Sequence, residues 1–299
     1  MDGSLPPDSL RAIARAQRRK WLKRALWAAA LLLVATIGTA WYSTMRDPVI
    51  RHLTLDLPGP AEAPPVRIVL LSDIHVSGPD MPPERLARIV AQVNALEPDI
   101  VMIAGDVVSD KRSATHIYTT AESIAPLARL EARLGKIAVP GNHDHWRDVV
   151  EVRRELEAVG FTVLQNEAIR VGPLAVGGLD DDFTRHADLP KVLAALEGLK
   201  GPQVILSHSP DPFADLPPGQ RLVLAGHTHC GQINWPWGGS PATMSRYGER
   251  YACGVVEENG NVLVVTAGLG TSVLPFRFLA WPDTWQVDLE DGGQDFPPA

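Results

Sequence analysis

Residue types that bind metal ions occur in five short clusters along the sequence. The clusters hold Asp73 and His75, Asp106, Asn142 with His143 and Asp144, His208, and finally His227 and His229. Neutral imidazole and carboxylate groups suit Zn, Mn or Fe, and such a site needs no thiolate. The Asp-x-His and His-x-His spacings each put two side chains on one side of an extended strand end. The sequence therefore predicts a metal site where these segments meet.

Each cluster follows a short apolar run that has the length and β-branched content of a strand. The runs are 66–71, 100–104, 136–139, 204–206 and 222–225. Helical patterns lie between them, at about 83–96, 114–132, 147–158 and 188–198. This alternation predicts an α/β sheet, in which ligands bind at the carboxyl ends of the strands. All five clusters sit at such ends, so they can converge on one site.

The pattern changes after residue 250. Segments 253–257, 262–266 and 284–289 predict strands joined by short turns, and together a second, more antiparallel sheet packed on the first. We place the globular domain at 66–290. A linker with a first strand precedes it at 46–65, and a Gly- and Pro-rich tail follows at 291–299.

An uncharged segment separates Arg24 from Arg46. Residues 25–45 are long enough to cross a bilayer, and Trp27 and Trp41 near its two ends are typical of membrane interfaces. We therefore predict a transmembrane helix at 25–45; a buried core helix is the alternative. Residues 1–24 carry seven basic and two acidic residues, a net charge of +5. The positive-inside rule then keeps this end in the cytoplasm and puts the domain on the outer, periplasmic face of the cytoplasmic membrane, with a single span.

Gln17–Lys23 resembles the twin-arginine export signal, although Gln stands where Ser or Thr is usual and Trp where Phe is usual. The twin-arginine translocase is thus a candidate partner, and an ordinary basic flank is the alternative. Gly38-Thr39-Ala40 is a candidate cleavage site. An anchored chain is favoured over a cleaved one.

The rest of the chain is acidic. The whole chain has a net charge of −7 and residues 1–24 carry +5, so residues 25–299 carry −12. Such a domain repels a phosphate backbone, so no nucleic acid partner is expected, whereas a small phosphate substrate can bind where metal ions invert the local field. The two cysteines, Cys230 and Cys253, form no CxxC pattern. A disulfide between them, a metal-bound Cys230 and a Cys230 that fills space all stay open.

The order of the five blocks resembles that of the calcineurin-like metallophosphoesterases, across about residues 66–290. The resemblance implies an α/β (α+β) fold of two packed mixed β-sheets flanked by helices, a four-layer αββα sandwich, with a dinuclear metal site. One divalent ion would be held by Asp73, His75, Asp106 and His229, and the other by Asp106, Asn142, His208 and His227. The identity of the two ions, Mn, Zn or Fe, stays open.

The implied activity is hydrolysis of phosphate esters, because two adjacent cations can clamp a phosphate and activate a water molecule. His143, next to Asn142, is the candidate general acid for the leaving oxygen. Asp144 could orient His143 or favour its imidazolium form. We expect Asp110 to serve structure rather than bind metal, and His145 to lie in an exposed loop.

The stretch from Gly226 to Gln232 reads GHTHCGQ and is similar to the GHTHxGQ motif of membrane-associated or exported bacterial phosphodiesterases. The segment 268–277 also resembles theirs, and its Arg277 is a candidate phosphate ligand or else a structural arginine. Trp235 and Trp237 follow the motif. Exposed tryptophans there would suit a lipid substrate near a membrane, and a packed loop is the alternative.

Three hypotheses follow. The first is a phosphodiesterase or phosphatase acting on a membrane lipid or cell-envelope phosphate. The second is a hydrolase of a lipid-linked sugar nucleotide, similar to UDP-2,3-diacylglucosamine pyrophosphatase, which would work on the cytoplasmic face. The third is a non-catalytic, metal-binding regulatory membrane protein, which would be expected to lack a ligand or the acid; none is missing here.

Overall fold

The computed structural model describes residues 7–57 and 65–291. The residues at 1–6, most of the expected linker at 58–64 and the expected tail at 292–299 lie outside the described residues.

The first sheet contains six strands in the order β1-β14-β2-β4-β6-β7. These are β1 (Val49–Leu57), β14 (Asp283–Asp291), β2 (Val66–Leu71), β4 (Ile100–Ala104), β6 (Gly135–Val139) and β7 (Phe161–Val163). β1 runs parallel to β14, β14 runs antiparallel to β2, and the remaining pairs are parallel. The sheet is therefore mixed, as expected.

The second sheet also contains six strands, in the order β12-β13-β11-β10-β9-β8. They are β12 (Gly254–Glu258), β13 (Asn261–Val265), β11 (Arg221–Ala225), β10 (Gln203–Leu206), β9 (Leu174–Gly178) and β8 (Glu167–Val171). The two outer pairs are antiparallel and the central strands are parallel. A small separate pair joins β3 (Ser77–Gly78) to β5 (His116–Ile117).

The strands divide between the sheets differently from the sequence-based expectation. β14 was expected in the second sheet with β12 and β13, but it lies in the first sheet between β1 and β2, while β10 and β11 belong to the second. Alternating Trp285, Val287 and Leu289 put their side chains into the core between the sheets. That alternation identifies a strand with one buried face, but it does not identify the neighbouring strand.

The sandwich has four layers. One core lies between the sheets. A second packs α2 (Pro83–Asn94), α3 (Thr120–Ile124) and α4 (Asn142–Ala158) on the outer face of the first sheet, and a third packs α5 (Leu189–Glu197) on the outer face of the second. Successive strand residues alternate between cores, because side chains on a strand point to opposite faces in turn. The structure confirms the expected two-sheet, four-layer fold.

The helix expected at 114–132 is shorter. α3 ends at Ile124 and is followed by a 3₁₀ turn over Ala125–Arg129. Pro126 explains the change, because proline removes a backbone donor and disfavours the α conformation in the residue before it.

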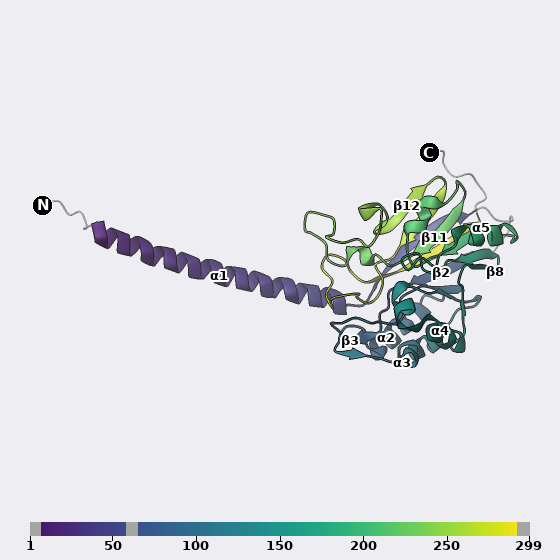
Figure 1. The fold of residues 1–299 in the computed structure, drawn as a ribbon, viewed down its shortest axis with the longest axis horizontal. Helices are drawn as coiled ribbons and strands as arrows, with labels where there is room; N and C mark the ends of the chain where they lie inside the picture. The colour runs from purple at the N-terminus through teal and green to yellow at the C-terminus, as the bar shows by residue number, and fades with distance from the viewer. Residues whose placement is uncertain (1–6, 58–64, 292–299) are drawn as a thin grey trace.

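α1 (Pro7–Met45) extends away from the domain as one long helix (Figure 1). It is longer than the span expected at 25–45, because the basic segment continues the same helix. Its stretch Arg15–Met45 is long and apolar enough to cross a membrane. Side chains such as Leu32 are 69% exposed, so α1 is not the buried core helix considered as the alternative. Its last turns contact the domain, and Ser43 and Thr44 are buried there.

Candidate metal centre

The site lies where the carboxyl ends of strands from both sheets meet. Asp73 and His75 follow β2, Asp106 follows β4, and Asn142 begins α4 after β6, all from the first sheet. The second sheet supplies His208 after β10, and His227 and His229 after β11. The structure brings all seven candidate ligands together, and each is buried.

One group of ligand atoms surrounds a point between His75 and His229. Their Nε2 atoms lie 3.2 Å apart. Oδ1 of Asp73 is 3.4 Å from Nε2 of His229 and 3.9 Å from Nε2 of His75. Oδ2 of Asp106 is 3.6 Å from Nε2 of His75.

A second group surrounds Nε2 of His208. That atom lies 3.0 Å from Oδ1 of Asn142, 3.1 Å from Nδ1 of His227 and 3.2 Å from Oδ2 of Asp106. Oδ2 of Asp106 therefore approaches both groups, which is the position of a bridging ligand.

These residues fit a pair of divalent cations. Oδ1 of Asp73 is buried and has no hydrogen-bond partner among the described residues, and the ligand atoms of Asp73, His75 and His229 all lie within 4.8 Å of one another. A buried carboxylate oxygen without a partner is costly unless a cation or donor meets it. The oxygen and imidazole donors suit Zn, Mn or Fe alike.

The electrostatics of the site agree with this fit at three of the four histidines. Burial holds the pKa of His75 and His229 well below the ordinary value, and burial together with His208 lowers the pKa of His227 to about 4. Three of the four imidazoles are thus kept neutral, the form that binds metal. Burial alone would lower the pKa of the fourth, His208, but the neighbouring Asp106 carboxylate raises it well above the ordinary value. Burial and the neighbouring Asp106 raise the pKa of Asp73 to about 6. Cations placed between these carboxylates would relieve their repulsion.

The backbone around the ligands is unusual. Asp73, His75, Asp106, His227 and His229 all have φ between 49° and 69°, in the left-handed region. Residues other than glycine adopt it rarely, at a cost of about 1–3 kcal/mol each, and such strain gathers at functional sites. The sequence showed no signal for this strain.

Two glycines allow the loops to approach one another. A Cβ on Gly105, whose φ is 79°, would lie 2.7 Å from Nδ1 of His208. A Cβ on Gly226 would lie 1.8 Å from Oγ of Ser72. Larger residues at either position would push the two sheets' loops apart.

His143 lies at the edge of the centre. Its backbone N–H donates to Oδ1 of Asp106 at 2.8 Å, its Nδ1 makes a short contact with the carboxylate of Asp110, and its Nε2 is 3.5 Å from Oγ of Ser272. Its ring packs edge-on against His75, with centroids 4.6 Å apart. Asp110 and Ser272 were therefore missed as partners of His143. The Gly-Asp-x-x-x-Asp spacing at 105–110 was the available signal for Asp110.

Asp144 does not make the contact expected of it. Its carboxylate accepts hydrogen bonds from the backbone N–H groups of Asp106 at 2.8 Å, Val107 at 3.0 Å, Val108 at 3.2 Å and Gly141 at 3.0 Å. As the third residue of α4, its side chain points back to the helix start. The interpretation that Asp144 orients His143 is wrong; it holds the loops that carry Asp106 and Asn142.

Arg277 is also not placed to bind phosphate. Its side chain is fully buried and donates to the backbone carbonyls of Ala267 at 2.6 Å, Gly268 at 3.2 Å and Gly270 at 2.6 Å. One guanidinium nitrogen is 3.3 Å from Nδ1 of His229. Burial lowers the pKa of Arg277 to about 10, which still leaves it charged near neutral pH. Its role here is structural, behind His229.

His145 differs from the exposed loop residue that was expected. Its Nε2 is 2.7 Å from Oδ1 of Asp180, and its ring stacks on His186 with centroids 4.2 Å apart. His145 thus ties the start of α4 to the loop after β9.

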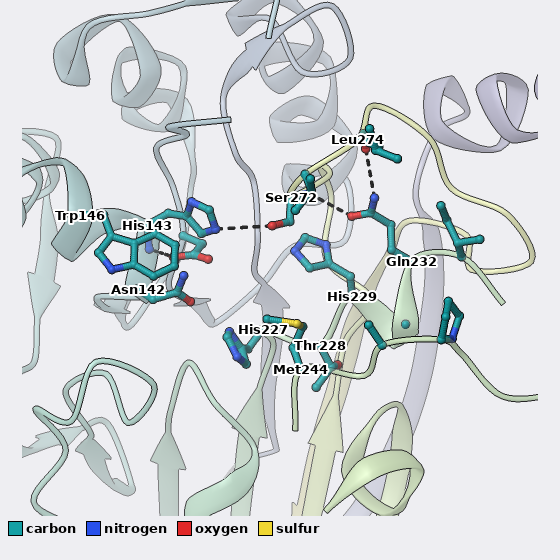
Figure 2. Close-up of a pocket in the computed structure, with 16 residues that line it drawn as sticks. Asn142, His143, Trp146, His227, Thr228, His229, Gln232, Met244, Ser272 and Leu274 are labelled. Carbon is teal, nitrogen blue, oxygen red and sulfur yellow. Dashed lines mark hydrogen bonds between the residues drawn. The ribbon is translucent and has the colours of Figure 1, made fainter. Parts of the chain in front are cut away.

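A cavity of about 320 Å³ opens over the ligands. Asp106, Asn142, His143, His227 and His229 line one end. Much of the remaining wall is apolar and is formed by Trp146, Ile233, Pro241, Ala242, Met244, Val273 and Leu274. Trp146, Met244 and Leu274 are labelled in Figure 2.

Gln232, the last residue of the GHTHCGQ motif, organises this wall. Its side-chain oxygen accepts from the N–H of Ser272 at 2.9 Å, and its amide nitrogen donates to the carbonyl of Leu274 at 3.0 Å. Figure 2 shows this connection from His143 through Ser272 and Gln232 to Leu274. The motif thus supplies His229 to the metal site. Through Gln232 it also positions the loop that carries Ser272 and Leu274, which faces His143.

Cys230 and Cys253 form a disulfide. Cys230 directly follows His229 and has a φ of 51°. The disulfide decides among the alternatives left open by the sequence: Cys230 neither binds metal nor merely fills space, and it fixes the loop after His229 to the start of β12.

Residues 66–231 match the profile of the calcineurin-like phosphoesterases, which covers more than half of the chain. A Helicobacter pylori protein named uncharacterized metallophosphoesterase is 30% identical over 274 residues, which are 88% of this chain and 70% of that protein. The uncharacterized metallophosphoesterase YkuE of Bacillus subtilis is 32% identical over 227 residues, covering 73% of this chain and 76% of YkuE.

A Danio rerio protein named transmembrane protein with metallophosphoesterase domain is 33% identical over 244 residues, covering 75% of this chain and 53% of that protein. Among solved structures, a 5'-nucleotidase precursor from Thermus thermophilus aligns over 75% of this chain and 54% of its own, with 15% identity and a TM-score of 0.42.

Proposed function

The chain belongs to the calcineurin-like phosphoesterase family, and on that premise we propose that it is a membrane-anchored hydrolase of phosphate esters whose substrate is a membrane lipid or cell-envelope phosphate. One observation carries the proposal. Seven ligand side chains from two sheets, with Asp106 between the two groups, converge beside a cavity whose remaining wall is largely apolar.

We assign Asp73, His75, Asp106 and His229 to one divalent ion, and Asp106, Asn142, His208 and His227 to the other. When bound, such a pair of ions neutralises the phosphate and supplies the nucleophile near neutral pH. The donor set supports Zn, Mn or Fe without choosing among them.

The residues beside the ions handle the leaving group. His143 lines the cavity next to Asn142 and is the proposed proton donor to the departing oxygen. Asp110 fixes the ring through Nδ1, which leaves Nε2 directed toward Ser272 and the cavity. Asp144 contributes indirectly, through the loops it holds.

The apolar wall supports a substrate with a hydrocarbon portion. A phosphate held at the metal end would place its organic group against Met244, Val273 and Leu274. Burying such a group would favour binding by about 25 cal/mol per Å² of apolar area. A highly charged, extended polymer would gain nothing there.

We propose that the domain lies on the outer face of the cytoplasmic membrane. The basic residues before the apolar stretch of α1 favour a cytoplasmic N-terminus, and the Cys230–Cys253 disulfide is typical of an oxidising compartment. A lipid-linked sugar nucleotide hydrolase would work on the opposite face. This topology therefore disfavours a reaction like that of UDP-2,3-diacylglucosamine pyrophosphatase.

A non-catalytic, metal-binding role is the remaining alternative. It is disfavoured because all seven ligand positions are occupied by suitable residues and His143 has both a carboxylate partner and access to the cavity.

The test uses purified full-length protein in detergent. Hydrolysis of bis-p-nitrophenyl phosphate is compared with that of p-nitrophenyl phosphate, with Mn, Zn, Fe and Ca each supplied to metal-free protein. We expect turnover with at least one ion and none for Asp106→Asn. No cleavage of either ester under any ion would refute the proposal.

Topology is tested separately. Alkaline phosphatase and green fluorescent protein are each fused behind β14. Active phosphatase and dark fluorescent protein would support the outer face if export is through the general secretory channel. A cytoplasmic location of the fused reporter, shown by protease protection in spheroplasts, would overturn it.

A further inference from the structure

Exposed apolar side chains gather on two loops near the end of α1. We call them the docking face: Trp235, Trp237, Val273, Leu274, Leu279 and Trp281. Trp237 is 80% exposed and Val273 is 72% exposed. The loops, one between β11 and β12 and the other between β13 and β14, lie on the side of the domain from which α1 extends (Figure 1).

The two loops form one unit. The N–H of Asn234 donates to the carbonyl of Phe278 at 2.8 Å, and the N–H of Phe278 donates to the carbonyl of Gln232 at 2.9 Å. Trp235 and Trp237 stack on each other with centroids 5.4 Å apart. The exposed apolar groups are therefore held in place by backbone pairing.

The end of α1 is fixed to the same unit. Oγ1 of Thr44 accepts from the N–H of Arg277 at 2.7 Å, and the ring of Trp41 meets that of Phe276 with centroids 6.2 Å apart. The guanidinium of Arg46 lies 4.0 Å from the centroid of the Trp281 ring. Because β1 begins at Val49, only residues 46–48 separate α1 from the first sheet.

So short a connection leaves the domain at the membrane surface. The apolar stretch of α1 continues to Met45, so the residues that follow it lie at the boundary with water. Tryptophan is enriched at this depth because its ring is apolar and its N–H is polar. A monomeric protein in water rarely keeps such a cluster uncovered.

We infer that the docking face rests in the headgroup region of the bilayer that α1 crosses, so that the cavity over the candidate metal centre opens at the membrane surface. Val273 and Leu274 belong both to the docking face and to the cavity wall, which joins the two. A substrate would then enter from the lipid phase without crossing water. The inference rests on α1 spanning the bilayer and not on catalysis.

The test places one nitroxide spin label at a time on full-length protein in liposomes. Labels are attached to Trp237→Cys and Leu279→Cys on the docking face. Leu32→Cys in α1 is the membrane control, and Val150→Cys on α4, where the side chain is 74% exposed, is the water control. Protein without an introduced cysteine should take up no label, because its two cysteines are paired.

Collision of each label with oxygen, which concentrates in lipid, is compared with collision with a water-soluble nickel complex. We expect the labels at positions 237 and 279 to collide more with oxygen than with the nickel complex, as the label at position 32 does. The label at position 150 should collide more with the nickel complex. If both docking-face labels match position 150, the inference fails. Spin–spin broadening between labelled copies would assign the face to self-association and would also overturn it. Loss of phosphoesterase activity alone would leave these readings unchanged, so the two proposals fail separately.

Discussion

Nε2 of His75 and Nε2 of His229 face each other at 3.2 Å inside the buried site, although one ring belongs to a loop of the first sheet and the other to a loop of the second. Burial holds the pKa of both rings well below the ordinary value, so both imidazoles are neutral near neutral pH. A divalent cation held by both nitrogens would make this arrangement favourable.

The first prediction concerns metal content. His229→Ala should lower bound metal from two ions per chain toward one, because His229 contacts only one of the two ligand groups, and should abolish most turnover. Metal is counted by mass spectrometry on protein purified with excess divalent ions. His52→Ala, on the exposed edge strand β1, is the matched control and should keep both ions. Equal metal content in the two variants would exclude His229 as a ligand.

The second prediction concerns the leaving group. His143→Ala should keep both metals but lower kcat on an alkyl phosphodiester by about 10²–10⁴-fold, because a poor leaving group needs a proton. p-Nitrophenyl esters, whose leaving group needs little protonation, should lose far less. Asp110→Asn should act in the same direction more weakly, since the ring would lose its carboxylate partner. Unchanged rates on the alkyl ester would remove His143 from the proposed role.

The third prediction separates the structural and substrate-binding interpretations of Arg277. In Arg277→Lys, the lysine ammonium cannot reach all the backbone carbonyls that the guanidinium now satisfies. Each buried carbonyl left without a donor lowers the stability of the fold by about 1–3 kcal/mol. We expect a lower apparent Tm in detergent and an unchanged KM for the protein that remains folded. Arg250→Lys, at an exposed salt bridge to Glu258, should change neither. A raised KM with an unchanged Tm would instead indicate phosphate binding.

The fourth prediction concerns the disulfide. Its cysteines are 23 residues apart, and closing a loop of this size stabilises a protein by about 3 kcal/mol. Dithiothreitol should therefore lower the apparent Tm of the wild type by about 6–12 °C. The double variant Cys230→Ser/Cys253→Ser should start from that lower Tm and not respond to the reductant. A reductant-insensitive wild type would contradict the prediction.

The fifth prediction concerns pH. Burial alone would lower the pKa of His145, but its bond to Asp180 raises it above 6.5, and the same bond helps to lower the pKa of the Asp180 carboxyl against the effect of burial. The histidine contribution to stability is complete below the unfolded pKa of about 6.5 and is lost as pH rises through the folded value. The aspartate contribution is present above about 3.9 and is lost as pH falls through the folded value.

His145→Gln should consequently lower the apparent Tm more at about pH 5.5 than at about pH 9. Asp180→Asn should reproduce this pattern, because either change removes the pair. An equal decrease in apparent Tm at both pH values would show that His145 stabilises the fold through packing on His186 alone.

Local patterns predicted most strands that carry the site. The runs before Asp73, Asp106 and His227 are short, apolar and β-branched, so their ends could be located within a residue or so. β7, β8 and β9 were not predicted, because they are short or contain glycine and lie among polar residues. The neighbour of β14 could not be predicted either, since pairing depends on distant segments.

The carboxylate partner of His143 was not predicted from the sequence. Adjacency to Asp144 suggested a partnership, but successive residues at the start of a helix point in different directions. The carboxylate that reaches His143 comes from Asp110, on another loop. Arg277 posed the same difficulty, since a charged residue in a glycine-rich loop gives no sign of whether it faces solvent or backbone carbonyls.

The position of β14 sets the order of events during synthesis. β1 and β2 lie near the start of the domain, yet the strand between them is made of residues 283–291. The ribosome must release residues 283–291 before that gap can close, whereas α1 precedes them in the chain and emerges earlier. Recognition of the anchor and completion of the domain are thus separated in time, and a chain interrupted before β14 keeps two unpaired edges open to chaperones and proteases.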